Sequence, residues 1–88
     1  MAKVWIPSLL RDLTNGQETV RVSGATVGEI IEALEQTYPG MKARLCDGPM
    51  LRRGLTVAVD TQVARLGLAQ PVRDDSEIHF IPAISGGS

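Results

Sequence analysis

The sequence is poor in the residues from which several kinds of site are built. It has one cysteine, Cys46, which excludes an internal disulfide framework and a zinc site made of four thiolates. It has one tryptophan, one tyrosine and one phenylalanine, its net charge is -1, and its basic residues form no long run. Because nucleic-acid binding needs a basic surface or a row of stacking rings, nucleic acid is not an expected partner.

Long apolar runs are also missing. The first strand-like segment stops at Pro7, so it predicts neither a signal peptide nor a membrane span. Because this segment is neither a signal peptide nor a span, and a single cysteine fits a reducing compartment, we expect a cytoplasmic protein without a membrane partner. The sequence also lacks a nucleotide-binding glycine loop, a metal-ligand cluster and a nucleophile motif. We therefore expect a protein that is not an enzyme, with no metal site and no bound cofactor.

The apolar residues that are present suffice for one small core. The chain has 88 residues, of which 43% are hydrophobic, and a second independent core would not fit in this length. From Ala83 onward the strand pattern is lost and the chain ends in glycine and serine. The expected organisation is therefore one domain over residues 1–82, followed by a flexible tail over 83–88.

Strand and helix patterns follow one another in a definite order. Alternating residues predict strands over 3–6 and 18–23, with a folded loop and turn over 8–17. The spacing of Thr26 and Glu29 is that of a capping box. A helix should begin there and end at Pro39-Gly40, because one apolar stripe runs through Val27, Ile30, Ile31, Leu34 and Tyr38. We expect an irregular crossover over 41–54, a short hairpin of 55–59 with 62–64, and a central strand over 77–81.

This order predicts an α+β fold of the β-grasp (ubiquitin-like) type. In that arrangement one helix covers one face of a mixed sheet, and the last strand lies in the middle. A plant-type ferredoxin would share the plan, but it needs four cysteines for its cluster. The fold alone does not decide the function, because several functions use it.

Three segments of the sequence carry a resemblance to a known family. They are Ile6-Pro7 with Leu10-Arg11, the helix start Thr26-Val27-Gly28-Glu29, and above all the stretch from Asp75 to Gly87, DSEIHFIPAISGG. A lone Gly-Gly is a weak signal, but an acidic turn, an apolar strand, a proline and Gly-Gly in register are specific. Over nearly its whole length the chain resembles the MoaD/ThiS ubiquitin-like sulfur carriers. The cysteine-synthase carrier is the most similar member, followed by the molybdopterin synthase subunit.

This resemblance implies a role for the tail as a carrier of sulfur. A partner of the ubiquitin-activating (E1-like) type would use ATP and Mg²⁺ to adenylate the carboxylate of Gly87, and a sulfur donor would convert it to a thiocarboxylate. The adenylate makes the carbonyl open to attack because AMP is a good leaving group. Ser85 and Gly86 would thread the narrow channel of the partner, since a glycine without Cβ lets the backbone pass closely. A sulfur-accepting synthase would then receive the sulfur.

Ser88 departs from the family pattern, because mature carriers end at glycine. Three interpretations remain open: trimming by a peptidase, for which a metallopeptidase is the expected partner; an expression remnant; or a tail that is not activated. Trimming ranks first among them. In that case Ser88 is the residue that is processed.

An apolar patch beside the tail is expected to be the landing site of the activating enzyme. Its candidate residues are Trp5, Phe80, Ile81 and Ile84, and the alternative is that these side chains simply pack in the sheet. Parity places Trp5 opposite Val4 and Ile6, but it does not decide which face of the last strand is buried. Cys46 and His79 have no partner at catalytic spacing and are expected to be structural.

Two other functions remain open. The first is a ubiquitin-like protein modifier, in which the activated Gly87 forms an isopeptide bond with a lysine of another protein. The second is a binding-only subunit with an inert tail. Conjugates that vanish when Gly87 is deleted would support the modifier, and a function unaffected by loss of residues 86–88 would support the subunit.

Overall fold

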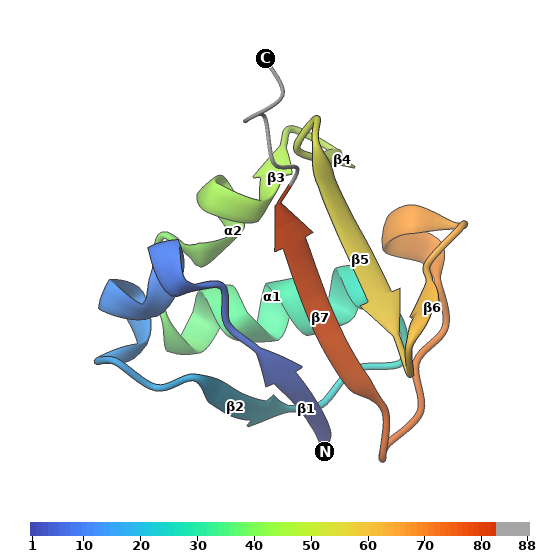
Figure 1. The fold of residues 1–88 in the computed structure, drawn as a ribbon, viewed down its shortest axis with the longest axis horizontal. Helices are drawn as coiled ribbons and strands as arrows, with labels where there is room; N and C mark the ends of the chain where they lie inside the picture. The colour runs from blue at the N-terminus through green and yellow to red at the C-terminus, as the bar shows by residue number, and fades with distance from the viewer. Residues whose placement is uncertain (83–88) are drawn as a thin grey trace.

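The computed structural model describes residues 1–82. A five-stranded sheet has the order β2-β1-β7-β5-β6. Its central strand β7 (Glu77–Pro82) pairs parallel with β1 (Ala2–Trp5) and antiparallel with β5 (Leu55–Val59). At the two edges lie β2 (Thr19–Val22) and β6 (Gln62–Val63). The predicted mixed sheet with a central last strand is confirmed (Figure 1).

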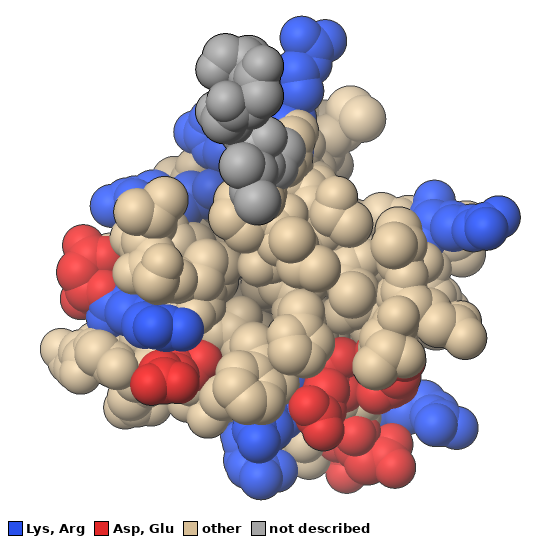
Figure 2. Space-filling view, in the orientation of Figure 1, with Lys and Arg blue, Asp and Glu red and all other residues tan. Residues whose placement is uncertain are grey.

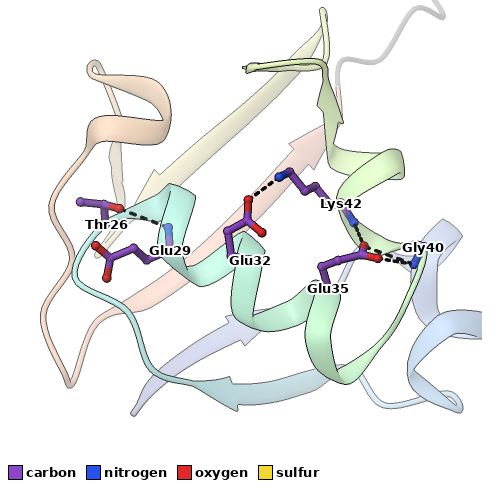
Figure 3. Close-up of polar contacts among 6 residues, drawn as sticks. All are labelled: Thr26, Glu29, Glu32, Glu35, Gly40 and Lys42. Atoms are coloured by element: carbon purple, nitrogen blue, oxygen red, sulfur yellow. Dashed lines mark hydrogen bonds and ion pairs between the residues drawn. The ribbon is translucent and has the colours of Figure 1, made fainter.

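The helix α1 (Val27–Thr37) lies across one face of this sheet (Figure 1). Its apolar stripe packs on the sheet through four buried residues, Val27, Ile30, Ile31 and Leu34. At its first turn the Thr26 hydroxyl accepts a hydrogen bond from the Glu29 amide at 3.2 Å (Figure 3). The Glu29 carboxylate accepts from the Ala25 amide at 2.9 Å. The Thr26 half of the predicted capping box therefore forms, and Glu29 reaches back one residue beyond the N-cap amide.

The segment before β2 is more regular than expected. Ser8–Thr14 forms the 3₁₀ helix η1, which buries Leu10 and Thr14. The Thr14 hydroxyl donates within this turn to the carbonyls of Arg11 and Gln17, at 3.2 and 2.9 Å. Asn15 and Gly16 then adopt positive φ angles of 57° and 83°, which is the turn that their sequence predicts.

The expected irregular crossover over 41–54 is wrong in part. Its first half forms the short helix α2 (Met41–Leu45), followed by a hairpin of β3 (Cys46–Asp47) and β4 (Met50–Leu51). Two kinds of contact stabilise this helix. Met41 and Leu45 are buried in the core, and the Glu35 carboxylate accepts hydrogen bonds from the amides of Gly40 and Lys42. Five residues are too few for periodicity to show in the sequence.

The 3₁₀ turn η2 (Gly67–Ala69) lies against α1. The backbone of η2 packs close to Gly28 in the first turn of α1. A Cβ added at Gly28 would lie only 3.2 Å from the Leu68 carbonyl oxygen, so a larger residue there would be crowded. No helix among residues 1–82 is both long enough and apolar enough to cross a membrane.

Candidate functional site

The site that matters for a carrier is the end of β7, because the tail begins there. Pro82 is the last described residue and pairs with Leu55 of β5. A hollow of about 190 Å³ lies beside it; its lining residues are Pro7, Leu9, Leu10, Arg44, Leu45, Leu55 and Pro82. Leu9 is the most exposed of the large apolar side chains, at 78%. The tail therefore starts beside an open, mainly apolar hollow.

The candidate tail residues Ile84, Ser85, Gly86, Gly87 and Ser88 lie outside the described residues. Their expected roles in docking, threading, activation and processing therefore remain predictions.

The face of the sheet opposite α1 carries Trp5. Its ring stacks on the ring of His79 at 5.2 Å between centroids and 10° between planes. The Lys3 ammonium lies over the same ring, 4.7 Å from its centroid. The Trp5 indole N–H donates to the Glu77 carboxylate at 3.1 Å. These contacts join β1 to β7 across their parallel pairing and hold the half-buried Trp5 in one orientation.

The structure places the two candidate residues of β7 on opposite faces. Ile81 lies on the open face and is 49% exposed, whereas Phe80 is only 5% exposed and belongs to the hydrophobic core. The expectation that Phe80 contributes to docking is thus corrected. Alternation along β7 puts Ile78 and Phe80 toward α1, and therefore His79 and Ile81 away from it. We call Trp5, His79 and Ile81 the open-face patch.

Sequence reasoning missed the group that holds the start of β7. The Asp60 carboxylate accepts from the Glu77 amide and from the Ser76 hydroxyl, both at 2.9 Å. The buried Ser76 hydroxyl also accepts from the Arg73 amide at 2.8 Å. These bonds favour the ionised carboxylate and so lower the pKa of Asp60. The bond from the Glu77 amide has the larger effect, and the bond from the Ser76 hydroxyl follows. In the sequence, Asp60 lies between the two expected strands 55–59 and 62–64, and this position does not reveal its partner across the sheet.

Cys46 and His79 both make packing contacts within the domain. The Cys46 side chain is buried in β3, and burial raises the pKa of its thiol, which disfavours the reactive thiolate. His79 stacks on Trp5 on the sheet's open face. Within residues 1–82, no group of three histidine, cysteine or acidic residues is placed to hold a metal ion.

Charge is distributed unevenly between the two ends of β7. Figure 2 shows basic side chains beside the end of β7, and acidic side chains with basic ones next to them at the opposite end of the molecule. Arg44 lines the hollow beside Pro82 and lies 3.9 Å from the Asp12 carboxylate. At the opposite end the carboxylates of Asp60 and Glu77 approach the start of β7.

Comparison with known proteins decides the family. The sequence profile of the ThiS family matches residues 4–87, which is nearly the whole chain. The chain belongs to the ThiS family. The sulfur carrier protein CysO of Mycobacterium tuberculosis is 37% identical over 89 residues, which covers 96% of each chain. The sequence-based prediction of a MoaD/ThiS sulfur carrier, rather than an enzyme, agrees with these findings.

Solved structures of similar proteins share the fold closely. In the BexX/CysO complex from Amycolatopsis orientalis, the matching chain is 38% identical with a TM-score of 0.93, and the match covers 99% of this chain and all of that one. CysO of Mycobacterium tuberculosis gives 35% identity and a TM-score of 0.89, covering 96% of this chain and 100% of the other. SAMP1 of Haloferax volcanii gives 27% identity and a TM-score of 0.79, and the match covers 98% of each chain. These similarities confirm the predicted β-grasp fold.

Proposed function

We propose that this ThiS-family protein is a cytoplasmic sulfur carrier that works through Gly87. After removal of Ser88 by a peptidase, expected to be a metallopeptidase, an E1-like enzyme adenylates the Gly87 carboxylate with ATP and Mg²⁺. Attack by a sulfur donor on the carbonyl carbon then displaces AMP and leaves a thiocarboxylate. The acceptor is a synthase of cysteine biosynthesis, with molybdopterin synthesis as the other expected destination.

The observation that carries this proposal is the family match, which extends to Gly87, together with the exit of the tail from the central strand. The relatives at 37% identity are named sulfur carrier protein CysO, which favours cysteine biosynthesis as the destination. β1 pairs with β7 as far as His79, and β5 pairs with it as far as Pro82. A rigid base of this kind lets the tail extend into the pocket of a partner without loss of the domain's core.

The open-face patch is the proposed landing site of the activating enzyme. Trp5 and Ile81 offer apolar area beside the tail exit, and Trp5 is held in place before any partner binds. Aromatic residues that are already ordered lose little conformational freedom on binding. CysO of Amycolatopsis orientalis forms a complex with BexX, which supports partner enzymes for this chain as well.

Intact-mass analysis of the protein isolated from its native cell tests the chemistry. We expect loss of Ser88 and exchange of one terminal oxygen for sulfur. Replacement of Gly87 by alanine should abolish the sulfur-containing species, whereas replacement of the exposed Leu66 by alanine should not. A native protein that retains Ser88 and never gains sulfur would refute the proposal.

A second candidate function, protein modification, is favoured by one relative. SAMP1 of Haloferax volcanii, at 27% identity, is named a small archaeal modifier protein among its solved structures. Modification would give heavier conjugates, with an isopeptide bond between Gly87 and a lysine of a target. Denaturing electrophoresis with antibody detection distinguishes the two, since a carrier gives a single species under reducing conditions.

A further inference from the structure

A groove of about 370 Å³ lies between β4 and η2, and we call it the hairpin groove. Its lining residues come from three segments, which are 49–52 around β4, Leu55 of β5 and 66–69 around η2. All of them except Arg52 are apolar residues or glycine. β4 and η2 contact each other directly, so the walls of the groove belong to one packed surface.

The hairpin groove lies on the α1 side of the sheet. Leu55 and Val57 point to the same face of β5, because side chains alternate along a strand, and Val57 pairs with the buried Phe80 of the core. The open-face patch is on the opposite face of the sheet. A partner bound at one of these surfaces therefore leaves the other uncovered.

The two sides of the groove carry exposed apolar side chains. Met50 is 69% exposed and Leu66 is 62% exposed. Single exposed apolar residues are ordinary on a protein surface, but these two flank a hollow whose other leucines, Leu51, Leu55 and Leu68, are partly buried against the core. The groove thus offers a seat for one large apolar side chain, and the unbranched Met50 can adapt to its shape.

Three arginines accompany the groove. Arg52 lines it, Arg53 follows in the turn before Leu55, and Arg65 precedes Leu66. All three are exposed, and none of them forms an ion pair with another residue that the structure describes. Their charges are therefore available to a partner.

Acidic side chains are scarce around this site. Between residues 48 and 69 the sequence has a single acidic residue, Asp60. Its carboxylate lies at the other end of β5, where it accepts from the Ser76 hydroxyl and the Glu77 amide. Asp47 faces Met50 across the β3–β4 hairpin but does not line the groove. The groove is thus apolar with a positive surround.

The Arg52 guanidinium is held in place before any partner binds. Its Nε and Nη2 atoms both donate to the Ala43 carbonyl, at 3.1 and 3.0 Å. A carbonyl group has no net charge, so these bonds fix the guanidinium without neutralising it. Its remaining N–H groups are free to bind a carboxylate. A cation that is already ordered loses little conformational freedom on binding.

We propose that the hairpin groove binds an acidic segment of a partner protein. One large apolar side chain of that segment sits between Met50 and Leu66, and carboxylates on either side of it pair with the three arginines. An anionic membrane fits less well, because a lipid surface is matched by protruding apolar residues rather than by a hollow, and the net charge of the chain is -1. All of these contacts lie within residues 1–82, so binding here requires no chemistry at Gly87.

Selection from a random peptide library displayed on phage, with the full chain as the target, tests the proposal. We expect the selected peptides to combine a large apolar residue with flanking acidic residues. In titrations of the ¹⁵N-labelled chain, the peptide selected most often should shift the amide signals of residues 49–53 and 65–69. A selection that returns no binding peptide, or peptides without acidic enrichment, or shifts confined to the open-face patch, overturns the proposal.

Charge variants then test the arginines, with the affinity of the same peptide measured by fluorescence polarisation. The double variant Arg53→Glu/Arg65→Glu should weaken binding by about tenfold or more, because two attractions become repulsions. Arg21→Glu makes the same kind of change on β2, at the opposite edge of the sheet, and should leave the affinity near that of wild type. Arg52→Lys keeps the charge but loses the fixed guanidinium, and should weaken binding about threefold. Equal affinities for the double variant and Arg21→Glu would refute the charge assignment.

An apolar pair of variants tests the seat of the side chain. Met50→Ser should weaken peptide binding by about fivefold, since apolar area is no longer covered. Val63→Ser is the control, because Val63 is similarly exposed but pairs with Ala58 on the other face of the sheet. Urea midpoints establish that each variant is folded. Equal losses for the two variants would place the peptide outside the groove.

Two other occupants have distinct signatures. Sedimentation equilibrium would reveal a second copy of the chain as a dimer that Arg53→Glu/Arg65→Glu dissociates. Cosedimentation with vesicles of phosphatidylserine and phosphatidylcholine would reveal a membrane. Either result overturns the proposal of an acidic protein segment, and we expect a monomer that remains in the supernatant.

Discussion

The opposite placement of Phe80 and Ile81 on β7 gives the sharpest test of how this sheet separates stability from docking. Phe80 is 5% exposed and Ile81 is 49% exposed, although they are neighbours in one strand. Truncation of a buried phenylalanine to alanine costs about 3–5 kcal/mol, since apolar contact is lost and a cavity remains. Ile81→Ala should cost only about 1 kcal/mol, because roughly half of its transfer free energy is at stake.

The loss expected for Phe80→Ala is a large fraction of the domain's free energy of unfolding, whereas the loss expected for Ile81→Ala is a small fraction. At about 0.05–0.15 kcal/mol per residue, a chain of this length unfolds with roughly 4–13 kcal/mol. Phe80→Ala should therefore lower the urea midpoint by about 2–4 M and Ile81→Ala by less than about 1 M. The fluorescence of Trp5, the only tryptophan, follows the transition because its stacking on His79 is lost on unfolding.

Docking should show the reverse order. Ile81→Ala should weaken binding to the activating enzyme with little change in the urea midpoint, whereas Phe80→Leu, which keeps an apolar side chain in the core, should retain binding. The assay is titration of the purified enzyme with each variant, and Leu66→Ala, another exposed apolar position, is the control. Equal urea midpoints for Phe80→Ala and Ile81→Ala would refute the assignment of the two faces.

Three further predictions concern the rest of the domain. Gly24→Ala should lower the thermal stability of the domain, because the new Cβ would lie 2.9 Å from the Ile30 amide nitrogen. Gly16→Ala is the comparison, since any loss of stability there comes from the positive φ of that residue. Since bonds from Glu77 and Ser76 lower the pKa of Asp60, its contribution to stability is complete above the ordinary carboxyl pKa and is lost as pH falls below it. Asp60→Asn should therefore lose stability at neutral pH and flatten the acid side of the urea-midpoint profile; an unchanged profile would contradict this. Cys46, buried with a raised thiol pKa, should react with iodoacetamide only after denaturation, as followed by mass spectrometry.

Much of the architecture followed from local patterns in the sequence. The capping residues and apolar stripe predicted α1, period-two alternation predicted the long strands, and the stretch that ends in Gly-Gly indicated the family. These signals are local, because each depends on residues within one turn of helix or a few residues of strand. The carrier prediction rested on this last segment, whose final five residues, 83–87, lie outside the described part of the chain.

Other features were decided only by the tertiary structure. Parity alone could not choose between Phe80 and Ile81; packing against α1 buries Phe80 and leaves Ile81 outside. The bond of Asp60 to Ser76 and the pair of Glu32 with Lys42 join residues that are far apart in the sequence. The short helix α2 is too brief for a period and forms through the burial of Met41 and Leu45. In each case the deciding free energy comes from contacts between elements, which no local pattern contains.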